Sequence, residues 1–374
     1  MKNHFKMKLK QKNTRCLSAY GHLTAVFPRL TAALLLTVCL TAAGLLSGCA
    51  QMRSSNETAL ILGTVINVRL YGKISQEKLD NAAKAALDRA RELEQIFSAT
   101  SDSSELSYVN QNAANGPVEV SPELYTVLER SLYFAELTGG AFDPTLGKLI
   151  NLWGIGTDHA RVPDISEITP LAEQKNYENV ILDEAHQTVM FTTEGFSLDL
   201  GGIAKGYAAD EMKKLLVEDY GITSAVLNLG GNIITIGPRY DGQPWTLGIV
   251  DPQNPQDSDH PAVLLKVEGK TFVTSGDYQR YFTGDDGQRY HHILDGATGY
   301  PARTGLSSVT IITDCSMDAD AWSTAAFVLG EEKATGLLKT IDGVEAVFIS
   351  ADETITATEG IRDQLQNGTL TVRP

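Results

Sequence analysis

The stretch Ser197-Leu-Asp-Leu-Gly-Gly-Ile-Ala-Lys-Gly-Tyr-Ala-Ala-Asp210 leads from an apolar strand through a glycine pair into an amphipathic helix. Gly201 and Gly202 permit a tight turn and the close approach of a ligand, because neither carries a Cβ. The N-terminus of the helix presents unpaired N–H groups, and Lys205 adds a cation there. The pattern indicates an anion site, and we expect a pyrophosphate; an ordinary strand-to-helix turn is the alternative.

The remaining periodicity predicts a chain of mixed strands and helices. A strand is expected over 59–70, interrupted at Gly63, and a hairpin is expected over 180–192. Further strands are predicted over 225–229, 245–250, 263–267 and 271–274, and helices over 76–97, from Pro122 to the glycine pair at 139–140, and from 317 to 329. A polar, proline-bearing loop over 157–170 suggests a seam between two lobes, near 157–175.

The N-terminal segment has the layout of a secretory signal. A basic region precedes an apolar run over 30–46, which ends in Leu-Ser-Gly-Cys49. This ending resembles a bacterial lipobox, in which Cys49 becomes the lipidated first residue. We therefore expect a signal peptide over 1–48, a tether over 49–58 and a globular part over 59–374, held outside the cytoplasm on a bacterial membrane. An uncleaved anchor is the alternative.

Charge and cysteine usage narrow the class of protein. Removing residues 1–48, which carry seven Lys or Arg and no acidic residue, changes the formal charge from −15 to −22. So acidic a body disfavours nucleic acid as a partner. Cys16 and Cys39 leave with the signal, and Cys49 and Cys315 remain. We therefore expect no internal disulfide, and an ordinary apolar core must hold the fold.

Two later stretches also carry polar groups on glycine-rich backbone. Asn228-Leu-Gly-Gly231-Asn232 ends a buried strand, and its amides could contact a polar ligand; a β-bulge is the alternative. The segment 290–301 contains adjacent histidines, His291 and His292, in a turn that we expect to lie outside the core. One of them is predicted to act as a general base or a phosphate ligand.

The stretch Met317-Asp-Ala-Asp-Ala-Trp-Ser-Thr324 is predicted to open a helix. Asp320 and Thr324 are four residues apart, so they share one face and can offer oxygen ligands to a hard cation. The alternative is a pair of acids that complements the helix dipole. No Cys/His cluster is present in the sequence, so zinc is not expected.

Together these motifs resemble the ApbE family of FAD:protein FMN transferases. Leu198 to Gly206, Asn228 to Asn232, His292-Ile-Leu-Asp-Gly-Ala-Thr-Gly299 and Asp318 to Thr324 follow the family's order. Ala141-Phe-Asp-Pro-Thr145 and Asn151-Leu-Trp-Gly154 agree with it. The resemblance covers residues 59 to the C-terminus. It implies an α+β fold with mixed β-sheets, flanking helices and an FAD cleft between two intimately joined lobes.

The resemblance also implies roles for particular residues. A magnesium ion would be held by the carbonyl of Ala204 and the side chains of Asp320 and Thr324, and His292 would be the catalytic histidine. With Asp320 and Lys205 these form the expected catalytic set. FAD contacts are expected at these positions: Leu62, Ala141, Phe142, Asp143, Gly201, Gly202, Lys205, Gly231, Asn232, His292 and Ile293.

The chain departs from the family pattern at three positions. Leu62 replaces a usual methionine, Thr100 stands where an aromatic residue is frequent, and Gly296 replaces a usual proline. The first two differences concern the pocket for the flavin ring rather than the chemistry. Asp295-Gly-Ala-Thr-Gly299 also resembles the acceptor motif of flavinylated proteins, but Tyr300-Pro301 breaks that motif, so we assign this segment to the enzyme.

The expected reaction transfers FMN from FAD to a Ser or Thr hydroxyl of an exported partner protein and releases AMP. Mg²⁺ and Lys205 would neutralise the pyrophosphate, and His292 would accept the hydroxyl proton. Two alternatives stay open. Water could replace the hydroxyl, which gives an FAD pyrophosphatase, or the chain could be an FAD-binding lipoprotein without turnover.

Overall fold

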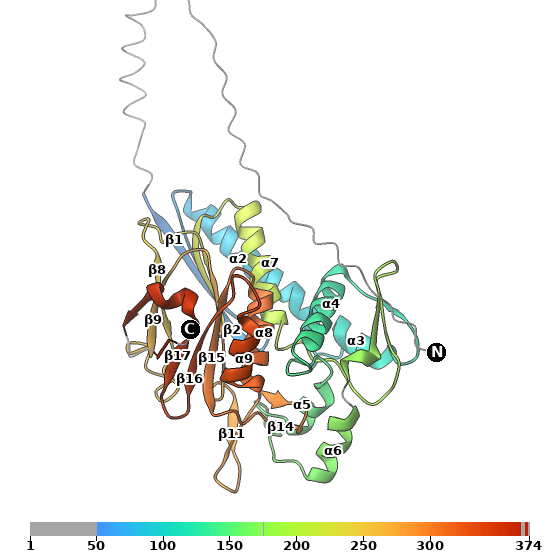
Figure 1. Ribbon diagram of the computed structural model, residues 1–374. Helices are drawn as coiled ribbons and strands as arrows, with labels where there is room; N and C mark the ends of the chain where they lie inside the picture. The colour runs from blue at the N-terminus through green and yellow to red at the C-terminus, as the bar shows by residue number, and fades with distance from the viewer. Residues whose placement is uncertain (1–50, 175, 368–370, 373–374) are drawn as a thin grey trace, which may run out of the picture. The chain divides into compact units, whose positions relative to one another are not determined.

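The computed structural model describes residues 51–174, 176–367 and 371–372 (Figure 1). The predicted signal peptide and Cys49 lie outside these residues. The described residues from Gln51 onward belong to one compact unit, and the seam near 157–175 stays a prediction. Strands and helices both contribute, which confirms the expected α+β class; the division into two lobes stays a prediction.

A nine-stranded sheet forms the centre of the described unit, in the order β1-β2-β6-β7-β10-β15-β16-β17-β19. Neighbouring strands are antiparallel except β17 and β19, which are parallel. The strands are β1 (Arg53–Ile61), β2 (Thr64–Gly72), β6 (Ser224–Leu229), β7 (Asn232–Ile236), β10 (Thr271–Gly276), β15 (Leu306–Thr313), β16 (Glu345–Ser350), β17 (Ile355–Ala357) and β19 (Thr371–Val372). All eight residues of β15 are buried, as expected for a central strand covered on both faces.

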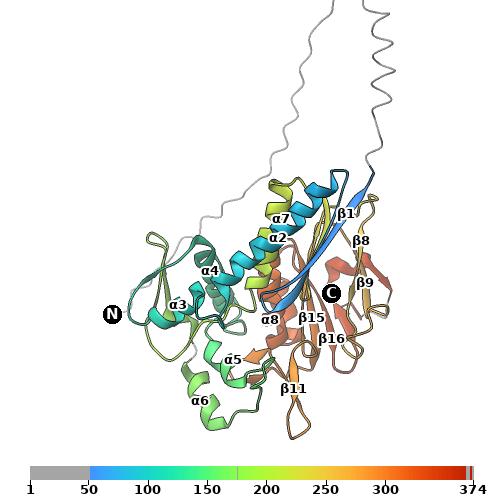
Figure 2. The same ribbon diagram turned by 180° about the vertical axis from the view of Figure 1, so that it is seen from behind.

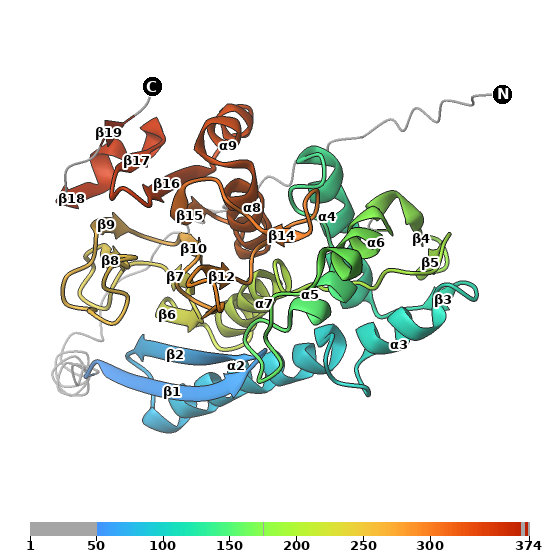
Figure 3. The same ribbon diagram turned by 90° about the horizontal axis from the view of Figure 1, so that it is seen from below.

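The two faces of this sheet are covered differently (Figure 3). Helices α2 (Gln76–Phe97), α7 (Ala204–Glu218), α8 (Ser316–Leu329) and α9 (Glu331–Leu338) lie on one face and enclose the largest apolar core. A small sheet of β8 (Trp245–Ile249), β9 (Val263–Val267) and β18 (Leu365–Asn367) covers part of the other face through a second core. The nine-stranded sheet is therefore the middle layer of three.

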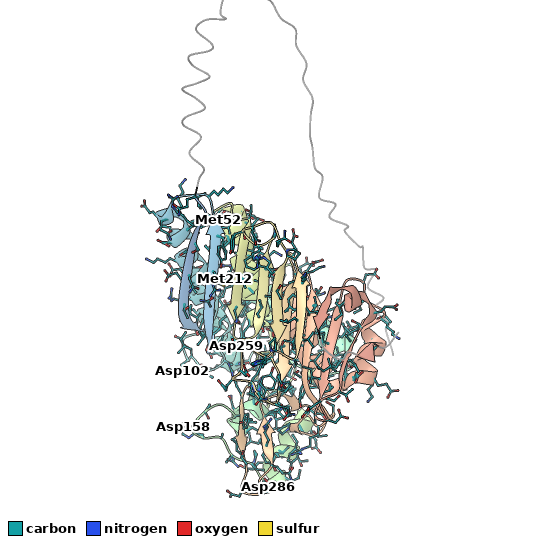
Figure 4. All side chains as sticks on the ribbon, turned by 90° about the vertical axis from the view of Figure 1, so that its left-hand side faces the viewer. Met52, Asp102, Asp158, Met212, Asp259 and Asp286 are labelled. Atoms are coloured by element: carbon teal, nitrogen blue, oxygen red, sulfur yellow. The ribbon has the colours of Figure 1, made fainter. Side chains whose placement is uncertain are left out.

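A further group of elements extends beyond the ends of α2 and α8. It contains α3 (Glu105–Asn112), α4 (Pro122–Leu137), α5 (Gly147–Trp153), α6 (Ile165–Gln174), the 3-10 turn η1 (Tyr177–Asn179) and a sheet of β3 (Val118–Glu119), β5 (Thr188–Phe191) and β4 (Val180–Asp183). Hairpins β11 (Tyr281–Thr283) with β12 (Arg289–His291) and β13 (Leu294–Asp295) with β14 (Tyr300–Pro301) follow, and η2 spans Glu359–Gln364. Asp158 and Asp286 lie at the end of the described unit opposite Met52 (Figure 4).

Most of the predicted elements are confirmed, and α2 shows why. Its alanines and leucines recur at helical spacing and are buried against β1 and β2, which the helix crosses (Figure 2). Ser75 caps its first turn by accepting a hydrogen bond from the Lys78 N–H. In α4, Ser121 caps the helix and Pro122 occupies the first turn, as predicted.

Three predictions about local structure are wrong. Strand β1 begins at Arg53, because 53–58 pair with β2. The strand start expected at 59 is therefore too late, and the tether expected over 49–58 is too long. The loop expected over 157–170 contains the start of α6, and Pro170 lies inside that helix. The apolar strand expected to end before the glycine pair is not formed, because 198–200 have no regular secondary structure and Ser197 makes only an isolated bridge with Leu146.

Candidate functional site

Helices α7 and α8 pack closely where Gly206 meets Ser316. A Cβ built on Gly206 would lie 2.2 Å from the carbonyl oxygen of Ser316, so only glycine lets the two helices approach this far. Gly206 belongs to the glycine-rich stretch that predicted an anion site. Its position shows that the stretch also brings the start of α7 against the start of α8.

Asp210 fixes the same contact one helical turn further along α7. Its carboxylate accepts hydrogen bonds from the backbone N–H groups of Ser316 (3.0 Å) and Met317 (2.8 Å) and from the Cys315 thiol (3.5 Å). It therefore caps α8 from outside that helix, which is needed because Cys315, the N-cap residue, makes no side-chain cap. We call Gly206, Asp210, Ser316 and Asp320 the α7–α8 joint. Burial raises the pKa of Asp210, against the effect of the two N–H donors.

The joint brings two predicted catalytic residues together. Asp320 is 3 % exposed, and its carboxylate accepts a hydrogen bond from the Gly206 N–H at 3.0 Å. Lys205 Nζ lies 3.4 Å from both carboxylate oxygens and donates to the Gly201 carbonyl at 2.6 Å. The charge of Lys205 is therefore partly balanced by Asp320, a pairing that their distance in sequence does not predict.

Three more predicted residues meet beside this pair. A Cβ built on Gly202 would lie 3.2 Å from both Thr324 Oγ1 and Phe142 Cε2. Phe142 is buried, and its N–H donates to the Thr138 hydroxyl at 3.1 Å. Glycine at position 202 thus keeps backbone, hydroxyl and ring edge in contact, and any other residue would fill the space between them.

The Asp143 carboxylate forms hydrogen bonds within a turn. Its Oδ1 accepts hydrogen bonds from the N–H (2.8 Å) and hydroxyl (2.6 Å) of Thr145. The following residues run beside the opening stretch, because the Asp199 N–H donates to the Pro144 carbonyl and the Gly147 N–H to the Ser197 carbonyl. The segment containing Ala141 to Asp143 therefore borders the glycine pair, as the predicted FAD contacts require.

Two glycine-bearing turns lie next to each other at the ends of β1 and β6. Leu62 and Gly63 have φ of 54° and 64°, the geometry of a two-residue hairpin turn, although Leu62 is not glycine. The Leu62 N–H donates to the Glu94 carboxylate at 2.6 Å, which offsets part of that strain. A Cβ on Gly230 would collide with Thr64, so the two turns are in contact.

The second turn supplies one unpaired buried donor. Asn232 is 2 % exposed, and its Nδ2 has no hydrogen-bond partner among the described residues. It lies on the same face of β7 as Ile234, which belongs to the core under the helices. Asn228, by contrast, accepts a hydrogen bond from the Gly231 N–H and shapes the turn itself. A buried amide without a partner is costly, so Asn232 is suited to a polar ligand.

The two adjacent histidines have different environments. His291 is 6 % exposed and packs edge-on against Phe327, so the expectation that both histidines lie outside the core is wrong. Its Nε2–H donates to the Ala302 carbonyl at 2.9 Å, and its Nδ1 accepts from the Ile293 N–H at 3.3 Å. Burial lowers the pKa of His291 to about 4. Both ring nitrogens are therefore engaged in neutral hydrogen bonds, which makes His291 structural.

His292 keeps one ring nitrogen available. Its Nδ1 lies 3.2 Å from the Arg280 carbonyl, which can only accept, so Nδ1 carries the proton and Nε2 has the lone pair. Part of its surface is exposed, yet burial and then the charge of Arg280 lower its pKa to about 3. The charge of Lys205 contributes to the same lowering, less than burial and Arg280 do. Ile293 is buried beside it.

Arg280 is a residue that sequence reasoning missed. Its carbonyl accepts the His292 N–H at 3.1 Å, and its Nη2 donates to the Gly63 carbonyl at 2.9 Å. It therefore connects the first glycine turn with His292; we call Arg280, His291, His292 and Ile293 the histidine turn. An isolated arginine in a polar loop matches no motif, so the sequence did not predict that Arg280 would contact the site. Asp210 had one, since it closes the opening stretch at helical spacing from Gly206.

Other features of the described residues bear on the predictions. No group of three or more His, Cys, Asp or Glu side chains within them is arranged to hold a metal. The predicted magnesium set has one carboxylate and would not form such a group. No helix in this part of the chain has the length and apolar character to cross a membrane. A separate depression between α4 and η1 is lined by none of the predicted site residues.

Sequence comparison connects the chain to curated proteins. The model of the ApbE family matches residues 62–348. An FAD:protein FMN transferase of Treponema pallidum is 39 % identical over 336 residues, which cover 86 % of this chain and 92 % of the relative. One from Klebsiella pneumoniae is 34 % identical over 300 residues, covering 80 % and 90 %.

Solved structures agree with this result. The ApbE protein of Thermotoga maritima superposes with a TM-score of 0.76 at 35 % identity and covers 84 % of this chain and all of its own. The flavin transferase ApbE of Vibrio cholerae gives 0.73 at 26 % identity, with the same coverage. The motifs, the fold and these matches together show that the chain belongs to the ApbE family.

Proposed function

We propose that this protein is a transferase that moves the FMN part of FAD onto a Ser or Thr hydroxyl of an exported partner protein. The observation that carries the proposal is the available Nε2 lone pair of a neutral His292, whose pKa is lowered in part by the charge of Lys205, the partner of Asp320. Curated relatives that are 39 % and 34 % identical over the aligned residues are named FAD:protein FMN transferase. Membership in the family supports FAD as the substrate.

In the proposed reaction, His292 Nε2 accepts the proton of the incoming hydroxyl. The hydroxyl oxygen forms a bond to the FMN-side phosphorus, and the bond between that phosphorus and the bridging oxygen breaks. AMP leaves with the electron pair of the broken bond, and the flavin stays attached through a phosphoester. Asn232 and the backbone around Gly202 would hold the pyrophosphate for in-line attack.

Three oxygen donors, one of them the joint residue Asp320, fit a magnesium ion. The Ala204 carbonyl, the Asp320 carboxylate and the Thr324 hydroxyl are hard oxygen donors, and Mg²⁺ is commonly held by one or two carboxylates together with waters and substrate phosphates. Gly202 lies beside the Thr324 hydroxyl, and a Cβ there would come within 3.2 Å of its Oγ1, so glycine keeps a further side chain away from this donor. When bound there, Mg²⁺ supplies charge neutralisation to the pyrophosphate. Lys205, within reach of Asp320, would share that role.

The protein incubated with FAD, Mg²⁺ and an acceptor protein tests the function. We expect fluorescent flavin covalently attached to the acceptor and release of an equal amount of AMP. FMN and AMP without labelled acceptor would instead indicate the pyrophosphatase alternative. FAD binding without AMP release would indicate a non-catalytic flavin lipoprotein.

We also propose that residues 1–48 are removed and that Cys49 carries the lipid anchor, which places the enzyme on the outer side of a bacterial membrane. The proposal rests on the basic and apolar regions and the Leu-Ser-Gly-Cys ending. Cys49→Ala should release the protein from the membrane fraction. An unchanged membrane fraction would contradict lipid anchoring and favour an uncleaved signal.

A further inference from the structure

Arg280 has an unusual position for an exposed cation in an acidic protein. One of its guanidinium nitrogens donates to the Gly63 carbonyl, and no carboxylate within the described residues forms an ion pair with it. The other arginine of this hairpin, Arg289, lies near Asp277 and over the ring of Tyr281. The guanidinium of Arg280 therefore keeps most of its donors for another partner.

Three parts of the proposed site lie next to Arg280 or its neighbour Gln279. Its side chain reaches the turn of Leu62 and Gly63, and its carbonyl orients His292. Its neighbour Gln279 lies against Gly231, next to the unpaired amide of Asn232. Its charge acts to lower the pKa of both His292 and Asp199, and its carbonyl contacts the imidazole directly.

The cation that sequence motifs assign to the pyrophosphate is already partnered. Lys205 Nζ donates to the Gly201 carbonyl and lies 3.4 Å from both oxygens of Asp320. A pyrophosphate has two phosphate groups, and a lysine held by a carboxylate neutralises only part of their charge. Arginine also presents a planar fork of donors that matches two phosphate oxygens, which lysine cannot do.

We propose that Arg280 binds the FMN-side phosphate of FAD. The AMP-side phosphate would then lie near Lys205 and Asp320. This inference rests on the proposed function for the choice of FAD as the ligand. It assigns the transferred phosphate to the side of the space where His292 lies, next to the attacking hydroxyl. The two cations would then hold the pyrophosphate at both ends, and the bond that breaks lies between them.

The test compares Arg280→Gln, Arg280→Lys and Arg69→Gln. Arg69 is exposed on β2 and has no ion pair among the described residues, so its substitution removes the same charge away from the site. FAD and riboflavin binding are each titrated by flavin fluorescence, since riboflavin has the ring without phosphate. Thermal unfolding shows whether each variant is folded.

We expect Arg280→Gln to weaken FAD binding about 10- to 100-fold, the scale of a lost charged hydrogen bond, and to leave riboflavin binding unchanged. Arg280→Lys should lie between Arg280→Gln and the unaltered protein, and Arg69→Gln should bind both ligands normally. Unchanged FAD binding in Arg280→Gln would overturn the assignment. An equal loss of riboflavin binding would also overturn it, because Arg280 would then only shape the flavin pocket.

The assignment of Arg280 and the proposed transferase function can fail independently of each other. If the unaltered protein transfers FMN but Arg280→Gln binds FAD normally, the function holds and the arginine assignment fails. If the unaltered protein binds FAD in an Arg280-dependent way but neither labels an acceptor nor releases AMP, the assignment holds and the transferase function fails.

Discussion

The α7–α8 joint and the histidine turn border the proposed site, and they use their polar groups in opposite ways. In the joint, the carboxylates of Asp210 and Asp320 are hydrogen-bonded to backbone N–H groups of the facing helix. In the histidine turn, His292 Nε2 and most donors of Arg280 have no partner within the described residues. The α7–α8 joint therefore fixes the positions of the helices, whereas the histidine turn keeps hydrogen-bonding groups available for substrate and acceptor.

Asp320→Ala should have the largest effect on activity, because it removes the charged ligand of the proposed magnesium set and the partner of Lys205. We expect FMN transfer to fall about 10³-fold or more. Transfer rates at increasing Mg²⁺, with circular dichroism to check folding, measure this.

Asp318→Ala is the matched control for Asp320→Ala. Asp318 lies in the same first turns of α8, but its carboxylate pairs with Arg130 at 2.6 Å. It should keep near-normal transfer. Normal activity of Asp320→Ala at ordinary Mg²⁺ would contradict the metal assignment and leave the joint with a purely structural role.

His292→Ala tests the opposite side of the site. Loss of the proton acceptor should reduce transfer by about 10²-fold or more, with FAD binding retained, since the phosphates are held by other groups. His291→Ala should have a much smaller effect on transfer, because both of its ring nitrogens bond to protein. If His291→Ala proves to be the inactive variant, the histidine turn is misassigned.

Gly206→Ala should separate the helices of the joint. The added Cβ meets the Ser316 carbonyl, and relieving this overlap should lower the free energy of unfolding by about 1–3 kcal/mol. Transfer should fall as well, because Asp320 moves with α8. Thermal unfolding and transfer rates measure the two effects.

Gly336→Ala in α9 is the matched control for Gly206→Ala. No atom lies within 4 Å of the Cβ it would add, so the substitution should stabilise the helix by about 0.5–1 kcal/mol. If both glycine variants changed the free energy of unfolding equally, the α7–α8 joint would have to accommodate a Cβ at position 206, which contradicts the close contact described.

The last prediction concerns the pH dependence of stability and involves no change in transfer. The pKa of His291 is about 4 in the folded chain and near 6.5 when unfolded, so the unfolded chain binds more protons between these values. The folded state should therefore lose stability as the pH falls from 6.5 to 4. His291→Gln should reduce this slope by at most about 1.4 kcal/mol per pH unit. Urea unfolding at several pH values checks it; an unchanged slope would mean that His291 is not buried as a neutral ring.

Short-range pattern determined most elements of the fold. The apolar spacing of α2, the caps of α4 and the alternation in β8 and β9 are local properties, and each was predicted within a few residues. The start of β1 was not, because residues 53–58 are polar and become a strand only through pairing with β2. Pro170 was assigned to a loop because it disfavours helix interiors, yet it lies inside α6.

The sequence by itself determined which residue types gather at the site, since glycines, Lys205, Asp320 and His292 occur in recognisable motifs. Only the tertiary structure decided how they are used. It paired Lys205 with Asp320, buried His291 more completely than His292, and brought Arg280 beside both the Leu62 turn and the imidazole. These contacts join residues distant in sequence, and burial and hydrogen bonding depend on what the folded chain places nearby rather than on residue type.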